Sequence, residues 1–105
     1  MAAYSVFLNP NPRTNAAVPF LLEVQSEVIS LLATRVVVPL YRPDVAEVRA
    51  MPPLTPVVQF QGQPFLAMVP ELAGIARRDL GPACGTLASA RGDILRAIDL
   101  LLTGF

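Results

Sequence analysis

Prolines constrain this chain more than any other residue type, because eleven of its 105 residues are prolines. A proline fixes φ near about −65° and has no amide hydrogen to give to a neighbouring strand. Strands therefore begin or end at prolines, or place them at a sheet edge or a bulge. Short apolar runs rich in Val, Leu and Phe lie between the prolines, so the middle of the chain is predicted to be β-structure made of short strands.

Six apolar runs are predicted to form strands. They cover residues 4–8, 20–25, 35–40, 56–61, 64–69 and 75–80, with Gly62 and Gln63 as the turn of a hairpin. Pro39 falls inside one of these runs and is expected at a sheet edge or a bulge. Residues 41–55 are long for a plain connection, so a short extra hairpin or a partner contact is expected there.

The last apolar run has a helical rather than a strand-like period. It covers residues 94–102; residues 84–89 are predicted to lead into it, with Thr86 or Ser89 as the N-cap. At about 100° per residue, one stripe of this helix is predicted to face the core. It holds Leu87, Ile94, Ala97, Ile98 and Leu101, with Phe105 in line if the helix continues.

Apolar residues also lie on both shoulders of this stripe. Leu95 and Leu102 lie on one shoulder with Asp99, and Leu100 lies on the other beside Asp93. The apolar arc is roughly 200° wide, whereas a surface helix needs only about 100° to pack on its own core. We therefore expect the helix either to be deeply buried or to present one shoulder to another chain.

The predicted fold class is mainly β with a C-terminal α-helix. Several short strands followed by one helix favour a small, strongly curled, mostly antiparallel sheet that the helix closes. A length of 105 residues suits one domain with a modest core, so a single domain over residues 1–105 is expected.

The charges argue against binding that depends on phosphate neutralisation. Eight acidic residues balance eight basic ones, and all the basic residues are arginines. Proteins that bind nucleic acid through phosphate collect Lys and Arg on one face. No stretch reaches about 18 uninterrupted apolar residues, and the first residues lack the features of a signal peptide, so a cytoplasmic protein without a membrane partner is expected.

The residues that carry most enzyme chemistry are missing. The chain has no His and a single cysteine, Cys84, which excludes a Cys–His pair and a zinc site of the usual ligands within one chain. No phosphate-binding glycine loop and no G-x-S-x-G motif occurs. The carboxylates are scattered and are expected to be solvated. No catalytic residue, metal site or cofactor is therefore predicted.

A set of motifs, in a fixed order from about Phe20 to the last residue, resembles a known family. The motifs are Val24-Gln25-Ser26-Glu27-Val28-Ile29, Arg35-Val36-Val37-Val38-Pro39-Leu40, Pro56-Val57-Val58, Gly81, Asp93-Ile94, Ala97-Ile98-Asp99-Leu100 and Gly104. Together they resemble the CcdB toxins of bacterial toxin–antitoxin systems. The match covers about four-fifths of the chain.

The resemblance implies a homodimer with an SH3-like barrel, the fold shared by CcdB and the related endoribonuclease toxins. It implies a protein that is not an enzyme but a topoisomerase poison: it binds the DNA gyrase A subunit and traps the cleaved gyrase–DNA complex. It also implies a cognate CcdA-like antitoxin, whose disordered segment folds over an overlapping surface. Toxin and antitoxin together repress transcription of their operon, so DNA is contacted only through that complex.

The resemblance also implies which residues bind gyrase. They are Val28, Ile29, Asp99, Leu102, Thr103, Gly104 and Phe105. The chain departs from the family at Thr103, where CcdB toxins have a Trp that stacks on a gyrase arginine, and at Asp99, which replaces an Asn. Phe105 is expected to supply the missing ring.

Two alternatives remain open at this stage. One is a homologue that keeps the fold and the antitoxin but does not poison gyrase. The other is an endoribonuclease toxin on the same fold, for which Arg35, Arg77 and Arg78 are the candidate RNA-binding residues.

Overall fold

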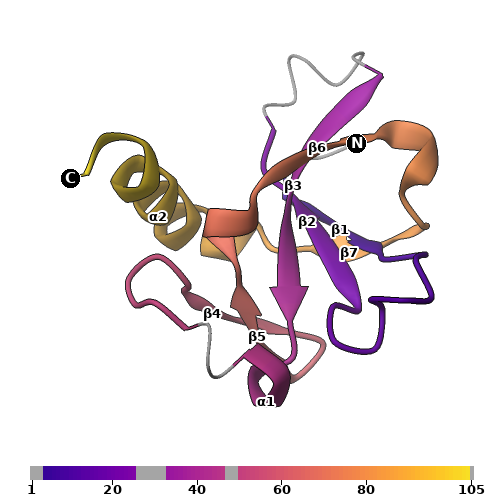
Figure 1. Cartoon of the computed structure of the whole chain (residues 1–105), viewed down its shortest axis with the longest axis horizontal. Coiled ribbons are helices and arrows are strands. Elements are labelled where there is room, and N and C mark those ends of the chain that lie inside the picture. Colours follow the sequence, from indigo (N-terminus) through magenta and orange to yellow (C-terminus); the bar gives the residue numbers. More distant parts are fainter. Residues whose placement is uncertain (1–3, 26–32, 47–49, 105) are drawn as a thin grey trace.

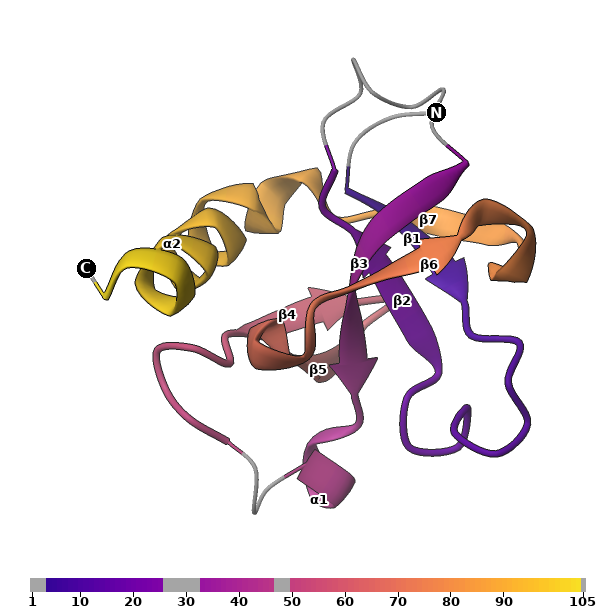
Figure 2. The same ribbon diagram turned by 45° about the horizontal axis from the view of Figure 1, so that its top comes forward.

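The computed structural model describes residues 4–25, 33–46 and 50–104 of the chain. It shows a strongly curled antiparallel sheet with a helix at the C-terminal end (Figures 1 and 2). The described strands are β1 Ser5–Leu8, β2 Phe20–Glu23, β3 Thr34–Tyr41, β4 Val57–Phe60, β5 Gln63–Ala67, β6 Ala73–Ala76 and β7 Ala83–Thr86. The helices are α1 Pro43–Ala46 and α2 Arg91–Thr103. The predicted fold class is confirmed.

The sheet curls around its longest strand, β3. The strand order is β4-β5-β3-β2-β1-β7, and β6 also pairs with β3. Strand β2 pairs with β3 on one side, whereas β5 and β6 share the other side: β6 pairs with residues 34–37 and β5 with residues 40–41. On this side the pairing partner of β3 changes from β6 to β5 along the strand, and the sheet bends into a half-barrel.

Pro39 lies where the partner of β3 changes. The prediction of a sheet edge or a bulge was wrong, because β3 is a central strand and Pro39 is paired with Leu21 of β2 in an unbroken register. On the other side of β3, however, Pro39 falls between the last partner in β6 and the first partner in β5. Its carbonyl accepts a hydrogen bond from the Met68 amide at 3.0 Å. A missing amide hydrogen is tolerated there because no ladder bond of β5 or β6 requires it.

The predictions for residues 75–90 were wrong in three places. The predicted strand 75–80 is instead the short β6 followed by a 3₁₀ turn over Arg77–Asp79. The predicted lead-in 84–89 overlaps β7, which pairs with β1. A further 3₁₀ turn, Ala88–Ala90, precedes α2. The N-cap of α2 is Ala90, without a side-chain hydrogen bond, so neither Thr86 nor Ser89 caps it. Most residues of these two strands are Ala or Gly, which have weak strand propensity.

The described part of residues 41–55 contains the one-turn helix α1 rather than the expected hairpin. A partner contact in this segment stays a prediction.

Each face of the sheet has its own apolar cluster. Neighbouring residues of a strand point to opposite faces. Leu22 and Val38 belong to the cluster beneath α2, and Leu21 and Val37 belong to the cluster on the other face. The rings of Phe20 in β2 and Phe60 in β4 meet edge to face at 5.1 Å, although their strands are not neighbours in the sheet. This contact follows from the curl of the sheet.

Gly81 holds the turn before β7 against the end of β1. Its amide donates to the Leu8 carbonyl at 3.0 Å, and an added Cβ would lie 2.5 Å from that oxygen. Gly81→Ala should therefore lower the free energy of unfolding by about 1–3 kcal/mol, as expected for forced overpacking. Urea unfolding measures this effect. Gly74→Ala is the matched control, because a Cβ at Gly74 meets no atom within 4 Å; equal stability of the two variants would contradict this assignment.

Candidate functional site

The candidate site is the C-terminal half of α2. The helix runs from Arg91 to Thr103 and ends at Gly104, which adopts the left-handed conformation with φ 80°. The Gly104 amide donates to the Leu100 carbonyl at 2.9 Å, as at a common glycine-terminated helix end. The predicted helix over residues 94–102 is confirmed, although it begins earlier, at Arg91. Phe105 lies outside the described residues.

Only the first part of α2 is packed on the sheet. Ile94 and Ala97 are buried, and Ile98 is half-buried against the core, as the predicted stripe requires. The expectation that Leu101 faces the core was wrong, because its side chain is 38% exposed. Figures 1 and 2 show the reason: the C-terminal end of α2 extends away from the sheet. The last residues of the apolar stripe, including Leu101, therefore have no core to pack on.

An exposed apolar surface results that extends from Leu95 to the C-terminal end of the helix. Leu102 is 74% exposed and Leu95 is 37% exposed. We call this area the helix-end surface; it comprises Leu95, Asp99, Leu101, Leu102 and Thr103. The structure thus brings Asp99, Leu102, Thr103 and Gly104 together in exposed positions. Val28, Ile29 and Phe105 lie outside the described residues, so the gyrase-binding role of the whole set stays a prediction.

The polar groups of the helix-end surface differ in their local partners. The Thr103 hydroxyl donates to the backbone carbonyl of Asp99 at 2.6 Å, so it turns back onto the helix. Asp93 and Arg96 form an ion pair one turn earlier. Among the described residues, no hydrogen bond or ion pair engages the Asp99 carboxylate. The helix end therefore presents one carboxylate beside exposed leucines.

A cleft of about 560 Å³ lies between α2 and the segment just before and at the start of β4. It is lined by Pro52, Pro53, Thr55, Pro56, Val57, Asp93, Arg96, Ala97, Asp99 and Leu100. The sequence placed Leu100 on the second shoulder of the helix, and this shoulder forms one wall of the cleft. The other wall comes from residues 52–57, which sequence reasoning could not bring next to the helix.

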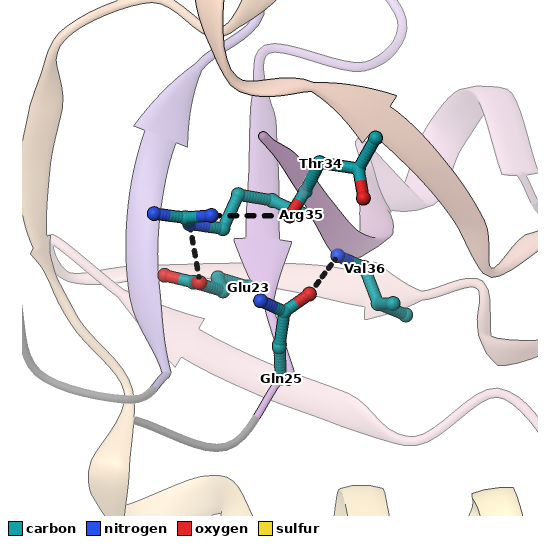
Figure 3. A network of polar contacts seen from close by, with 5 residues as sticks. All are labelled: Glu23, Gln25, Thr34, Arg35 and Val36. Atoms are coloured by element: carbon teal, nitrogen blue, oxygen red, sulfur yellow. Dashed lines mark hydrogen bonds and ion pairs between the residues drawn. The ribbon is translucent and has the colours of Figure 1, made fainter. Parts of the chain in front are cut away.

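A buried polar network fixes the end of β2 against β3 (Figure 3). The Arg35 Nε lies 3.2 Å from the Glu23 Oε2, and both side chains are buried. The Gln25 Oε1 accepts from the Val36 amide at 3.0 Å. Burial raises the pKa of the Glu23 carboxyl, and the Arg35 charge lowers it in part. The expectation that all carboxylates are solvated was therefore wrong for Glu23.

The same network bears on the three arginines suggested for RNA binding. Arg35 is buried and paired with Glu23, whereas Arg77 and Arg78 are exposed in a 3₁₀ turn. Arg35 and Arg77 line a cavity of about 250 Å³, and Arg78 does not. The three arginines do not form one exposed basic groove.

The remaining chemistry of the described residues is limited. Within residues 4–25, 33–46 and 50–104, no group of three or more His, Cys, Asp or Glu side chains is placed to hold a metal ion. The Cys84 thiol is half-buried and donates to the Val6 carbonyl at 3.4 Å, and burial raises its pKa. A raised thiol pKa lowers the fraction of nucleophilic thiolate.

No helix in the described part of the chain is long and apolar enough to cross a membrane.

Comparison with known proteins identifies the family. A comparison with curated protein sequences gives no match. The family model of the CcdB protein matches residues 3–104, which is nearly the whole chain and includes both α2 and the strands that support it. The chain therefore belongs to the CcdB protein family.

Proposed function

We propose that this chain is a toxin that binds the DNA gyrase A subunit and traps the cleaved gyrase–DNA complex in the cytoplasm. Membership of the CcdB family implies a toxin of a toxin–antitoxin system and not an enzyme, which argues against the RNA-cleaving alternative. The proposal extends to a single toxin domain over residues 1–105, a homodimer, a cognate CcdA-like antitoxin and co-repression of the operon with that antitoxin.

The exposed helix end is the observation that carries the proposal. Leu102 is 74% exposed. It lies at the C-terminal end of α2, and this end extends away from the core. Burying such a side chain in a partner contributes about 1.5–3 kcal/mol. Asp99 and Thr103 lie on the same surface, so three of the residues proposed to bind gyrase can enter one partner site together.

Other leucines of the helix-end surface are exposed as well. Leu95 and Leu101 remain more than one-third exposed, at 37% and 38%, although both lie on a helix that packs its first turns on the core. The fold therefore leaves more apolar helix surface than Leu102 alone, which fits an apolar partner site for this end of the helix.

Expression in a bacterial host tests the proposed function. The chain should cause filamentation and DNA damage, and co-expression of an antitoxin encoded just upstream should rescue growth. Growth without DNA damage, at a protein level that still binds the antitoxin, would contradict gyrase poisoning.

Thr103→Trp should strengthen gyrase trapping. An aromatic ring stacked on an arginine contributes about 0.5–2 kcal/mol, and about 1.4 kcal/mol corresponds to a tenfold change in affinity. Thr103 is exposed, so a larger side chain fits without disturbing the core. The concentration of toxin that gives half-maximal DNA cleavage by gyrase should fall about tenfold.

Thr103→Leu is the matched control, because it adds an apolar side chain of intermediate size without a ring. If the Trp and Leu variants act at the same concentration, stacking does not account for the gain.

One observation favours a second candidate, a homologue that keeps the antitoxin but does not poison gyrase. Thr103 offers no ring, and its hydroxyl is already engaged by the helix at 2.6 Å. This candidate predicts a non-toxic protein that still represses its operon together with the antitoxin.

A further inference from the structure

The cavity that Arg35 and Arg77 line lies on the face of the sheet opposite α2. Phe7 also lines it, and Phe7 is paired with Leu21 of the apolar cluster on that face. Leu80 and other residues of the segment between β6 and β7 complete the wall. Among the described residues that line the cavity there are two guanidinium groups and no carboxylate.

The wall that carries Arg77 is held at both ends by backbone hydrogen bonds. The Arg77 amide donates to the Ala33 carbonyl at 2.8 Å, and the Gly81 amide donates to the Leu8 carbonyl at 3.0 Å. Between them, the Leu80 amide donates to the Arg77 carbonyl at 3.2 Å. The cavity is therefore preformed, and a ligand does not have to order this loop when it binds.

The charges around the cavity favour an anion. The Arg35 side chain is only 8% exposed and is paired with Glu23, as Figure 3 shows, but Glu23 does not line the cavity. The positive end of this buried ion pair therefore faces the cavity. Among the described residues, no hydrogen bond or ion pair engages the Arg77 guanidinium. Asp79, the nearest acidic residue in the sequence, lines a different cavity, so Arg77 supplies one uncompensated positive charge.

Charge, shape and size together select the kind of anion. A single uncompensated cation balances a monoanion, whereas a dianion would leave one charge without a partner beside apolar walls. A guanidinium donates two parallel hydrogen bonds to a carboxylate. Phe7, Leu80 and Pro82 offer apolar surface to the rest of the ligand. The cavity volume is about 250 Å³, whereas ordinary ligand pockets begin at about 300 Å³, so the apolar part must be short.

We propose that this cavity binds a free monocarboxylate with a short apolar body, such as a branched short-chain acid. The carboxylate pairs with the Arg77 guanidinium above the buried Arg35, and the apolar body packs against Phe7 and Leu80. The site lies on the opposite face of the sheet from α2, so the proposal does not depend on the proposed function.

Titration of the full chain with four small probes at constant ionic strength tests the chemistry of the cavity. The probes are isobutyrate, acetate, isobutyramide and sulfate, and amide chemical shifts report their binding. Isobutyrate should give saturable shifts at the amides of Arg77, Leu80 and Ala83, which line the cavity.

Each of the other probes removes one feature of the proposed ligand. Acetate lacks most of the apolar body and should bind at least about threefold more weakly than isobutyrate. Isobutyramide has the same shape without the charge and should bind at least about tenfold more weakly, because the charge-assisted hydrogen bonds are lost. Sulfate is a dianion and should also bind more weakly. The absence of saturable shifts with isobutyrate, or binding of any other probe as tight as that of isobutyrate, would overturn the proposal.

A matched pair of variants tests the place of binding. Arg77→Gln removes the uncompensated guanidinium and should weaken isobutyrate binding at least about tenfold. Arg78→Gln makes the same change at the next residue of the same 3₁₀ turn, which does not line the cavity, and should leave binding unchanged. Both arginines are exposed, so both variants should fold as the unmodified chain does. Equal affinity of the two variants for isobutyrate would overturn the assignment of the carboxylate to Arg77.

Discussion

Arg35→Met should lower the free energy of unfolding by about 3–5 kcal/mol, the usual effect of removing one partner of a buried ion pair. The substitution keeps an apolar side chain of similar length but leaves the Glu23 carboxyl buried without the guanidinium that lies 3.2 Å away. Urea unfolding at neutral pH measures the loss. Glu23 and Arg35 join the ends of β2 and β3, so the effect should appear as destabilisation of the whole fold.

The pH dependence of this variant identifies the cause. Burial raises the pKa of Glu23 above its ordinary value of 4.5, and Arg35 lowers it in part. A raised carboxyl pKa means that the folded state binds the proton more tightly than the unfolded state does. The penalty is therefore present at pH values above the raised pKa and is relieved as the pH falls through it towards 4.5.

Without Arg35 the pKa of Glu23 should rise further, so the defect of Arg35→Met should shrink on acidification. The double variant Glu23→Gln/Arg35→Met serves as the control, because a neutral amide removes the buried charge and should recover part of the stability. A loss that is independent of pH and unchanged in the double variant would show that packing, not charge, explains the effect.

Ile94→Ala should lower the free energy of unfolding by about 2–5 kcal/mol, as for other large-to-small core substitutions. Ile94 is fully buried and joins the first turns of α2 to the core beneath the sheet. Since Leu101 and Leu102 contribute little to packing on the sheet, Ile94 and Ala97 carry most of the attachment of the helix. Thermal or urea unfolding of the variant measures it.

Leu102→Ala is the matched control on the same helix. Its side chain is 74% exposed, so its removal should change stability by no more than about 0.5 kcal/mol. This pair of variants separates the two ends of α2: one end stabilises the fold, and the other is available to a partner. A similar loss of stability in both variants would mean that the helix end is packed in solution.

Strands with strong side-chain signals were predictable from the sequence. Phe20, Leu22 and Val24 occupy every second position of one run. The structure places Leu22 in the cluster beneath α2 and packs Phe20 and Val24 against it. The strands β6 and β7 were not predictable in their observed positions, because most of their residues are Ala or Gly, which have weak strand propensity. They form strands because β3 and β1 offer them free edges to pair with.

The candidate site was only partly predictable for a similar reason. The helical period correctly placed Ile94 and Ala97 against the core, but the exposure of Leu101 depends on where the sheet ends beneath the helix. The burial of Glu23 depends on Arg35 in the next strand. The cleft depends on residues 52–57 lying beside α2. Contacts between distant segments decide all three features, and a local pattern carries no information about them.

The most direct test of the central claim is DNA cleavage by the matched gyrase in the presence of the purified chain. Supercoiled DNA, gyrase and ATP are incubated with increasing amounts of the chain, and linear DNA is measured after the gyrase is denatured. Gyrase poisoning predicts that linear DNA accumulates with dose and disappears when the antitoxin is added in excess. No linear DNA at any dose, from a preparation that binds its antitoxin, would contradict it.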